Sequence, residues 1–148
     1  MIVELNNRDV DVANKILSVS LNAYRVEAKL LGLASFPPMN ERAESIVGSK
    51  SRFLGFMVER VLLGVIEVEV LGSNRLHINR LVVDPSMFRK GIASKLIDAV
   101  LPREQVLSVT TATSNSPAMS LYQSHGFTLA NIEVVGDRLE LSTLEKQT

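Results

Sequence analysis

A strand-to-helix turn near the middle of the chain combines basic and small residues. Arg89 and Lys90 precede Gly91, and Ala93 falls within the first turn of the helix that follows. The N–H groups and the positive dipole end at a helix start attract anions such as pyrophosphate, and small residues let a ligand approach the backbone. The alternative is an ordinary connection with two solvated cations. The spacing matches neither the P-loop nor the Rossmann glycine pattern, so neither of those nucleotide sites is predicted.

The strand that enters this turn carries His77, and strand alternation predicts what faces it. For the apolar residues of two successive strands to share one face, Val70 must pair with Leu76. Glu69 then lies opposite His77, and Glu67 follows on the same side of the sheet. The predicted result is a polar patch that raises the pKa of His77 and attracts a positively charged ligand. An ordinary solvated sheet face is the alternative.

The periodicity of apolar residues predicts the elements that position these side chains. Alternation predicts strands, and recurrence every three or four residues predicts helices. Three successive strands imply an antiparallel meander, and the strand–helix–strand order after them implies one parallel crossing. The predicted strands are residues 2–5, 53–59, 61–70, 76–83, 106–111, 127–135 and 138–144, and the predicted helices are residues 10–21, 24–31, 41–47, 90–101 and 117–124.

Local signals predict several boundaries of these elements. Asn6 or Asn7 is expected to cap the first helix, because a short polar side chain can accept from the free N–H groups there. Two consecutive prolines predict that residues 34–39 are extended. Gly126 is expected to end the last helix in the left-handed conformation, and Gly136-Asp137 to turn the final hairpin.

Composition limits the class of protein. The chain has 148 residues, of which 46% are hydrophobic, and this predicts a single domain over residues 1–148. Sixteen basic residues balance sixteen acidic ones, so neither nucleic acid nor an anionic membrane is expected as a partner. The absence of cysteine excludes disulfides, thiolate metal sites and a cysteine nucleophile, and no metal site is predicted. With no pattern of a signal peptide or a membrane span, we expect a cytoplasmic domain.

Two motifs, in this order, resemble those of the GNAT family of N-acetyltransferases. The first family motif is Gln/Arg-x-x-Gly-x-Gly/Ala at a strand-to-helix turn, and Gly91-Ile92-Ala93 matches it. The second is Asn-x-x-Ala-x-x-x-Tyr-x-x-x-Gly-Phe, and residues 115–127 match it at every specified position. Phe88 departs from the first motif, because it stands at the slot that is usually Gln or Arg and commonly assists pyrophosphate binding. The element order around both motifs also fits the family.

The resemblance implies an α+β (mixed α/β) fold with acetyl-CoA as cosubstrate. The GNAT fold has a central, mostly antiparallel sheet of six or seven strands, with one splayed parallel pair and about four helices on both faces. Acetyl-CoA lies at that pair, which would be residues 76–83 and 106–111. Backbone groups of Leu81 and Val83, with Val82 between them, would pair with the pantetheine arm. Asn115 would bond to the same arm, although it also reads as a plain helix N-cap. The pyrophosphate would be held at Arg89, Lys90, Gly91, Ile92, Ala93 and Ser94.

The resemblance also implies direct attack of an amine on the thioester. Tyr122 matches the family's general acid, since a phenol with an ordinary pKa of about 10 can protonate a thiolate whose thiol has a pKa of about 8.5. His77 stands where several family members have a base, and its ordinary pKa of about 6.5 suits that role, with Glu69 opposite it. A backbone N–H near Val83 would stabilise the oxyanion. The alternatives are a tyrosine that plugs the end of a short helix and a strand histidine with no catalytic part.

The predicted function is therefore acetyl-CoA-dependent acetylation of a primary amine on a small molecule or an amino-acid-like acceptor, as an N-acetyltransferase. The segment Tyr24–Met39 and the loop after Phe127 would form the acceptor site. One alternative is a CoA-binding regulatory domain with weak or no turnover, for which Phe88 is the reason. Another is an unrelated α+β domain whose Gly91 turn binds a different phosphorylated ligand. A homodimer and a small bacterial type are expectations that come from the resemblance alone.

Overall fold

The structure is a computed structural model of the 148-residue chain, and it describes residues 1–101, 105–136 and 139–148. The chain forms two compact units. The first combines Met1–Val68 with Arg80–Val100, and the second combines Glu69–Asn79 with Leu101–Thr148. One strand, Arg75–Val83, therefore contributes its first half to the second unit and its second half to the first.

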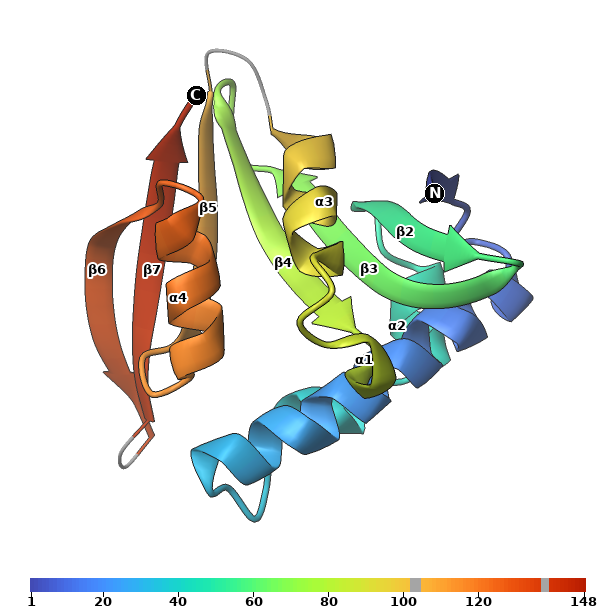
Figure 1. Ribbon diagram of the computed structural model, residues 1–148, viewed down its shortest axis with the longest axis horizontal. Helices are drawn as coiled ribbons and strands as arrows, with labels where there is room; N and C mark the ends of the chain where they lie inside the picture. The colour runs from blue at the N-terminus through green and yellow to red at the C-terminus, as the bar shows by residue number, and fades with distance from the viewer. Residues whose placement is uncertain (102–104, 137–138) are drawn as a thin grey trace. The chain divides into compact units, whose positions relative to one another are not determined.

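Seven strands form a mixed sheet in the order β1-β2-β3-β4-β5-β7-β6 (Figure 1). The pairing of β4 with β5 is parallel, whereas β1–β2, β2–β3, β5–β7 and β6–β7 are antiparallel. With four α-helices among the described residues, this arrangement confirms the predicted mixed α/β fold class. The strands are β1 (Ile2–Leu5), β2 (Arg52–Val58), β3 (Val61–Val70), β4 (Arg75–Val83), β5 (Val106–Ala112), β6 (Thr128–Val135) and β7 (Leu139–Gln147), and the helices are α1 (Val10–Leu31), α2 (Ala43–Val47), α3 (Ile92–Val100) and α4 (Ser116–Ser124).

In the first unit, α1 is one continuous helix of 22 residues. The prediction of two helices, over residues 10–21 and 24–31, was wrong. The two residues between these ranges are Asn22 and Ala23, and neither ends a helix as glycine or proline does. Because no local signal breaks the chain there, the apolar stripe that starts at Val10 continues through the second range.

The N-terminus of α1 is capped by an aspartate rather than by an asparagine. The carboxylate of Asp9 accepts from the N–H of Asp11 at 2.9 Å. Asn7, one of the two predicted caps, is buried instead, and its side-chain amide donates to the carbonyl oxygens of Ile46 and Ser49 at 2.7 and 3.0 Å. The asparagine therefore joins the start of α1 to the end of α2, a contact between residues that are distant in the sequence.

The connection from α1 to α2 contains a helical turn. Gly32 ends α1 with a left-handed φ of 68°, and Pro37–Asn40 then forms a 3-10 turn, η1. The prediction that residues 34–39 are all extended was therefore wrong in its second half. Phe36 is extended, as the residue before a proline should be, but a proline itself fits the start of a helical turn because it needs no N–H partner there.

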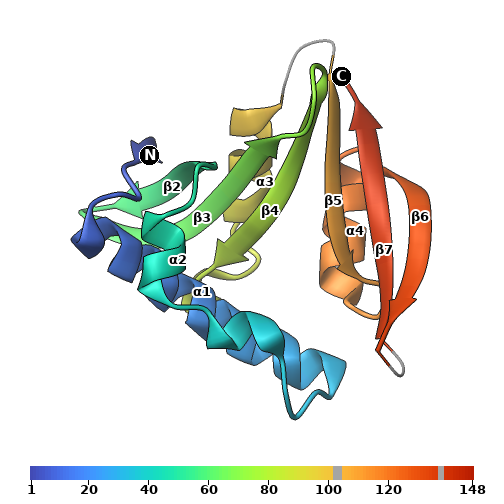
Figure 2. The same cartoon turned by 180° about the vertical axis from the view of Figure 1, so that it is seen from behind.

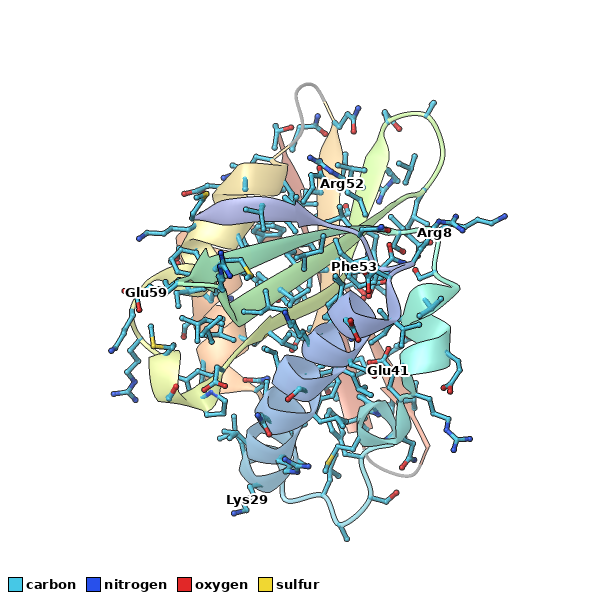
Figure 3. All side chains as sticks on the ribbon, turned by 90° about the vertical axis from the view of Figure 1, so that its right-hand side faces the viewer. Arg8, Lys29, Glu41, Arg52, Phe53 and Glu59 are labelled. Carbon is cyan, nitrogen blue, oxygen red and sulfur yellow. The ribbon has the colours of Figure 1, made fainter. Side chains whose placement is uncertain are left out.

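Helices cover both faces of the sheet in the first unit. The helices α1 and α2 lie on one face of β2 and β3, and α3 lies on the other (Figures 1 and 2). Figure 3 shows Phe53 of β2 beside α1. On the α3 face, Gly64 of β3 permits a close approach, because a Cβ there would lie 2.8 Å from Ile92 Cγ2. The buried cluster between α1 and the sheet consists of Ala13, Ile16, Val19, Ile46, Phe53, Leu62, Val65 and Val82.

In the second unit, α4 packs on the face formed by β5 and β7 (Figures 1 and 2). The helix ends as predicted, since Gly126 follows its last turn with a φ of 87°. All eight residues of the edge strand β6 are exposed. In the final hairpin, Gly136 has a positive φ of 60°, as a turn residue can, while the predicted turn residue Asp137 lies outside the described residues.

None of the described helices has the length and apolar character that a membrane crossing requires.

Candidate active site

The basic turn of the first unit leaves its backbone open. A short 3-10 turn, η2 (Pro85–Met87), is capped by Asp84, and two residues with positive φ follow it, Arg89 at 63° and Gly91 at 79°. Both are exposed, as is Lys90. A Cβ built on Gly91 would meet no atom within 4 Å. The start of α3 is thus reached through exposed backbone beside two cations, which suits a pyrophosphate.

Residues on either side of the turn divide between core and surface. Ile92 and Val82 are 3% and 5% exposed, so their side chains belong to the core. Only the backbone of these two residues is left to contact a ligand. Leu81, Val83, Ala93 and Ser94 are half-buried. Phe88, at the slot where the family has Gln or Arg, is 42% exposed.

In the second unit, Asn115 caps α4. Its Oδ1 accepts from the N–H of Ala118 at 3.2 Å, which confirms the N-cap interpretation of the residue. The cap does not use the amide Nδ2, which can donate a hydrogen bond to pantetheine. The binding role stays a prediction.

Tyr122 is held firmly within the second unit. It is 6% exposed, and its ring packs edge-on against Phe127 with centroids 5.5 Å apart. The carbonyl oxygen of Tyr122 also accepts from the N–H groups of His125 and Phe127. The motif therefore has a structural use, because its tyrosine and phenylalanine pack together where α4 ends. The role of the phenol as an acid stays a prediction.

His77 contacts the neighbouring strand. The parallel register places it beside Ser108, and Nδ1 lies 2.7 Å from the serine hydroxyl oxygen. The pKa of His77 is lowered from its ordinary value, because burial disfavours the charged ring more than Glu69 favours it. The predicted rise in this pKa was therefore wrong, since the expectation counted the carboxylate but not the burial.

The predicted turn register is nevertheless correct. The N–H of Leu71 donates to the carbonyl of Arg75 at 2.8 Å, which places these two residues opposite each other. Val70 then faces Leu76, as predicted. Glu69 is half-buried and acts on His77 as a neighbouring negative charge.

Glu67 has a different role from the one that the polar patch implied. It is 6% exposed, accepts from Arg80 Nε at 2.9 Å, and lies 3.4 Å from the hydroxyl of Ser49. Its carboxylate therefore forms a buried ion pair with Arg80 and is not accessible to an amine.

Arg80 is the centre of a charged cluster that the sequence analysis did not single out. The residue is 8% exposed. Its guanidinium donates to both carboxylate oxygens of Glu41, at 2.7 and 2.6 Å, and to the hydroxyl of Ser20 at 2.9 Å, besides the bond to Glu67. In the sequence, Arg80 falls on the strand face that it shares with Leu76 and other apolar residues, so the pattern indicated that its charge is buried. A buried charge needs a partner, and this was the signal for the cluster.

Within the described part of the chain, no group of three or more His, Asp or Glu side chains is placed to hold a metal ion.

Comparison with known proteins identifies the family. A family model described as an acetyltransferase (GNAT) domain matches residues 23–148. The chain belongs to the GNAT family. A curated relative, UPF0157 protein YqkA of Bacillus subtilis (strain 168), is 36% identical over 145 residues, which are 96% of this chain and 42% of that protein. The chain thus spans less than half the length of the curated relative that it matches.

Solved GNAT structures share the fold of this chain. The PaiA N-acetyltransferase from Thermoplasma acidophilum, in complex with coenzyme A, superposes with a TM-score of 0.75 at 18% identity, covering 100% of this chain and 98% of that one. The ribosomal-protein-S18-alanine N-acetyltransferase from Escherichia coli gives 0.75 at 18% identity, covering 99% and 92%. At this identity the likeness confirms the GNAT fold, and the bound coenzyme A agrees with the expected cosubstrate.

Proposed function

We propose that this GNAT domain transfers the acetyl group of acetyl-CoA directly to a primary amine of a small or amino-acid-like acceptor. The observation that carries the proposal is the family match over residues 23–148, which contains both motifs. The exposed turn at Arg89 and Gly91 supports it, because exposed backbone N–H groups beside cationic side chains can bind a pyrophosphate. The absence of cysteine supports direct transfer through a ternary complex rather than an acyl-cysteine.

The proposed cosubstrate contacts are mainly backbone contacts. Leu81 and Val83 would pair with the amide groups of the pantetheine arm as an added strand does, with the Val82 side chain anchored in the core. The pyrophosphate would be bound by N–H groups from Arg89 to Ser94, and Asn115 would donate to the arm. These contacts depend little on side-chain identity, so Phe88 at the usual Gln or Arg slot would weaken CoA binding without abolishing it.

In the proposed reaction, the neutral amine attacks the thioester carbonyl carbon and forms the C–N bond. A backbone N–H near Val83 stabilises the resulting oxyanion. Collapse of the tetrahedral intermediate breaks the C–S bond, and Tyr122 gives its proton to the departing thiolate of CoA. The amine loses one proton to His77, directly or through a water molecule, so the products are the amide and CoA thiol.

The lowered pKa of His77 supports its role as the base. A ring with a pKa below 6.5 is neutral near pH 7 and has one nitrogen able to accept a proton. The hydroxyl of Ser108 can donate to the carbonyl of Leu76 at 3.4 Å, and it then accepts from Nδ1–H of His77. In that arrangement Nε2 is the nitrogen that takes the proton from the amine.

The acceptor class rests on the family and on the segment Tyr24–Met39. GNAT proteins of the same fold act on different amines, and a fold by itself does not select among them. The name of the Escherichia coli neighbour states alanine of a ribosomal protein as its acceptor. Amino acids, their amides and other small primary amines are therefore the first amines to test.

The decisive experiment measures thiol release from acetyl-CoA across such a panel of amines, with the Tyr122→Phe variant beside the unaltered protein. We expect amine-dependent release, and a fall of about 10²-fold or more in kcat for Tyr122→Phe because the thiolate loses its acid. The ring still packs against Phe127, so CoA affinity and melting temperature should change little. A variant with full activity would contradict the assignment of Tyr122.

The regulatory alternative predicts a different result in the same assay. Tight CoA binding by calorimetry, with no thiol release for any amine, would favour a binding domain over an enzyme. Its motivation is Phe88, the one departure from the first motif.

A further inference from the structure

The buried Arg80 cluster joins four elements of the first unit to the segment that follows η1. The arginine comes from β4, Glu67 from β3 and Ser20 from α1, while Glu41 directly follows η1. The guanidinium also lies over the ring of Phe53 on β2, 5.7 Å from its centroid. A single side chain thus contacts the sheet, α1 and Glu41, which lies two positions beyond the proposed acceptor segment Tyr24–Met39.

The charged groups of this cluster bind one another, so they are not available to bind a ligand or to act as a base. Four hydrogen bonds saturate most of the guanidinium, so Arg80 is not a free anchor for an acceptor carboxylate. Both oxygens of Glu41 accept from Arg80, so Glu41 is not a free base. Burying such charges is unfavourable unless they are well paired, and removing one partner leaves the other uncompensated.

The segment between α1 and α2 depends on few other side-chain anchors. No residue of η1 is buried. Near its start, the ring of Phe36 packs edge-on against Tyr24, with centroids 6.1 Å apart. Near its end, the bidentate contact of Arg80 with Glu41 fixes both the distance and the orientation of the chain. This follows because the guanidinium and the carboxylate are both planar groups joined by two parallel hydrogen bonds. Burial also raises the pKa of Tyr24 to about 12, so this ring stays neutral.

We propose that Arg80 is a positioning residue for the acceptor: by holding Glu41, it fixes residues 33–42 in the conformation that binds the amine. This inference rests on the proposed function, because it takes residues 33–39, which lie within Tyr24–Met39, as part of the acceptor site. The turn that contacts CoA lies beyond the end of β4 and shares none of these bonds. The cluster should therefore act on the amine and not on acetyl-CoA.

The test compares Glu41→Gln with the unaltered protein. Glutamine keeps the shape of glutamate but loses the charge and one acceptor, so it weakens the contact with Arg80 without emptying the site. We expect the KM for the best amine of the panel to rise about tenfold, since small displacements of a binding segment have large kinetic effects. The KM for acetyl-CoA should stay within about twofold, and hydrogen exchange of residues 33–42 should become faster.

The matched control is Glu4→Gln, which removes the partner of Arg52 in the same unit. That pair is exposed, at 56% and 61% of its side-chain surfaces, and exposed pairs contribute little. Figure 3 shows Glu41 and Arg52 well apart on this unit. Arg80→Lys serves as a second variant: lysine keeps the charge but lacks the planar fork, so the amine KM should rise here too.

Two results would overturn the proposal: unchanged exchange of residues 33–42 in Glu41→Gln, or equal rises in the KM values of both substrates. Failure of the unaltered protein to acetylate any amine is distinct from these. It would overturn the proposed function and the acceptor role together, while the exchange measurement would still decide whether Glu41 fixes the segment.

Discussion

His77 combines a lowered pKa with a short contact to Ser108, and both properties come from its place beside β5. Burial removes part of the hydration of the charged ring, and the carboxylate of Glu69 restores only some of that stabilisation. The serine hydroxyl holds the ring in one orientation at 2.7 Å. A neutral, oriented imidazole is what a base needs in order to accept a proton near pH 7.

This environment predicts the pH dependence of the reaction. Protonated His77 cannot accept a proton, so kcat/KM should rise with pH through the His77 pKa, with its acid limb below pH 6.5. Glu69→Gln removes the charge that raises this pKa, so the limb should move to still lower pH. A pH–rate profile from pH 4.5 to 8 measures the position of the limb in the unaltered protein and in Glu69→Gln.

Glu133→Gln is the control for that profile, because it removes an exposed carboxylate from β6. It should leave the acid limb unchanged. A shift of the limb to higher pH in Glu69→Gln, or an unchanged limb in His77→Gln, would contradict the assignment.

The helix α3 begins at the basic turn proposed to bind CoA, and its position depends on β3. Gly64 lies under α3, where a Cβ would be 2.8 Å from Ile92 Cγ2 and 3.2 Å from Leu96 Cδ1. Both are branched side chains in a packed core, which have little freedom to move. The glycine therefore sets how closely the helix packs on the sheet, and with it where the first turn of α3 lies.

Gly64→Ala should lower the free energy of unfolding by about 1–3 kcal/mol, because the added methyl group overpacks this contact. It should also weaken CoA binding by shifting the start of α3. Chemical denaturation and calorimetry measure the two effects.

Gly48→Ala is the matched substitution. Gly48 has a helical φ of −81°, and a Cβ there would lie at an ordinary 3.4 Å from the Glu44 carbonyl oxygen. We expect unchanged or slightly increased stability, since alanine restricts the unfolded chain. Equal losses for the two variants would show that the contact with α3 is not the cause.

For the whole molecule, the zero net charge conceals local separation of charge. Basic residues gather at the turn proposed to bind CoA, where Arg89 and Lys90 are exposed. A buried excess of negative charge lies at the Arg80 cluster, where two carboxylates surround one guanidinium. The exposed cations suit a phosphate, whereas the two carboxylates are occupied by Arg80 and do not form an open site. Overall charge is therefore a poor guide to the ligands of this protein.

Ligand binding should stabilise the whole chain. Acetyl-CoA at about 100 times its Kd should add about 2.7 kcal/mol to the free energy of unfolding, because it binds only the folded state. Thermal melting with acetyl-CoA, and with ATP at the same concentration, measures this effect. We expect a clear rise in melting temperature with acetyl-CoA and a smaller one with ATP. A rise with ATP alone would favour the alternative of a different phosphorylated ligand at the Gly91 turn.

Much of the fold is predictable because its signals are local. The bounds of β1 and β3 were predicted correctly, and so was the turn that pairs Val70 with Leu76. Side-chain alternation and turn residues act over a few positions, so a sequence displays them directly. The two cofactor motifs are equally local, which is why they identified the family. Where local signals were weak, as between the two expected halves of α1, the prediction failed.

The sequence by itself determined the family and the order of the strands. Tertiary structure decided which charged groups are buried and which partners they have. The bond between Arg80 and Glu41 joins residues 39 positions apart, and the contact between His77 and Ser108 spans 31 positions. Burial and the choice of partner depend on which distant residues meet, and no spacing in the sequence encodes this. For the same reason, the sign of the His77 pKa shift followed from packing and not from its nearest charged neighbour.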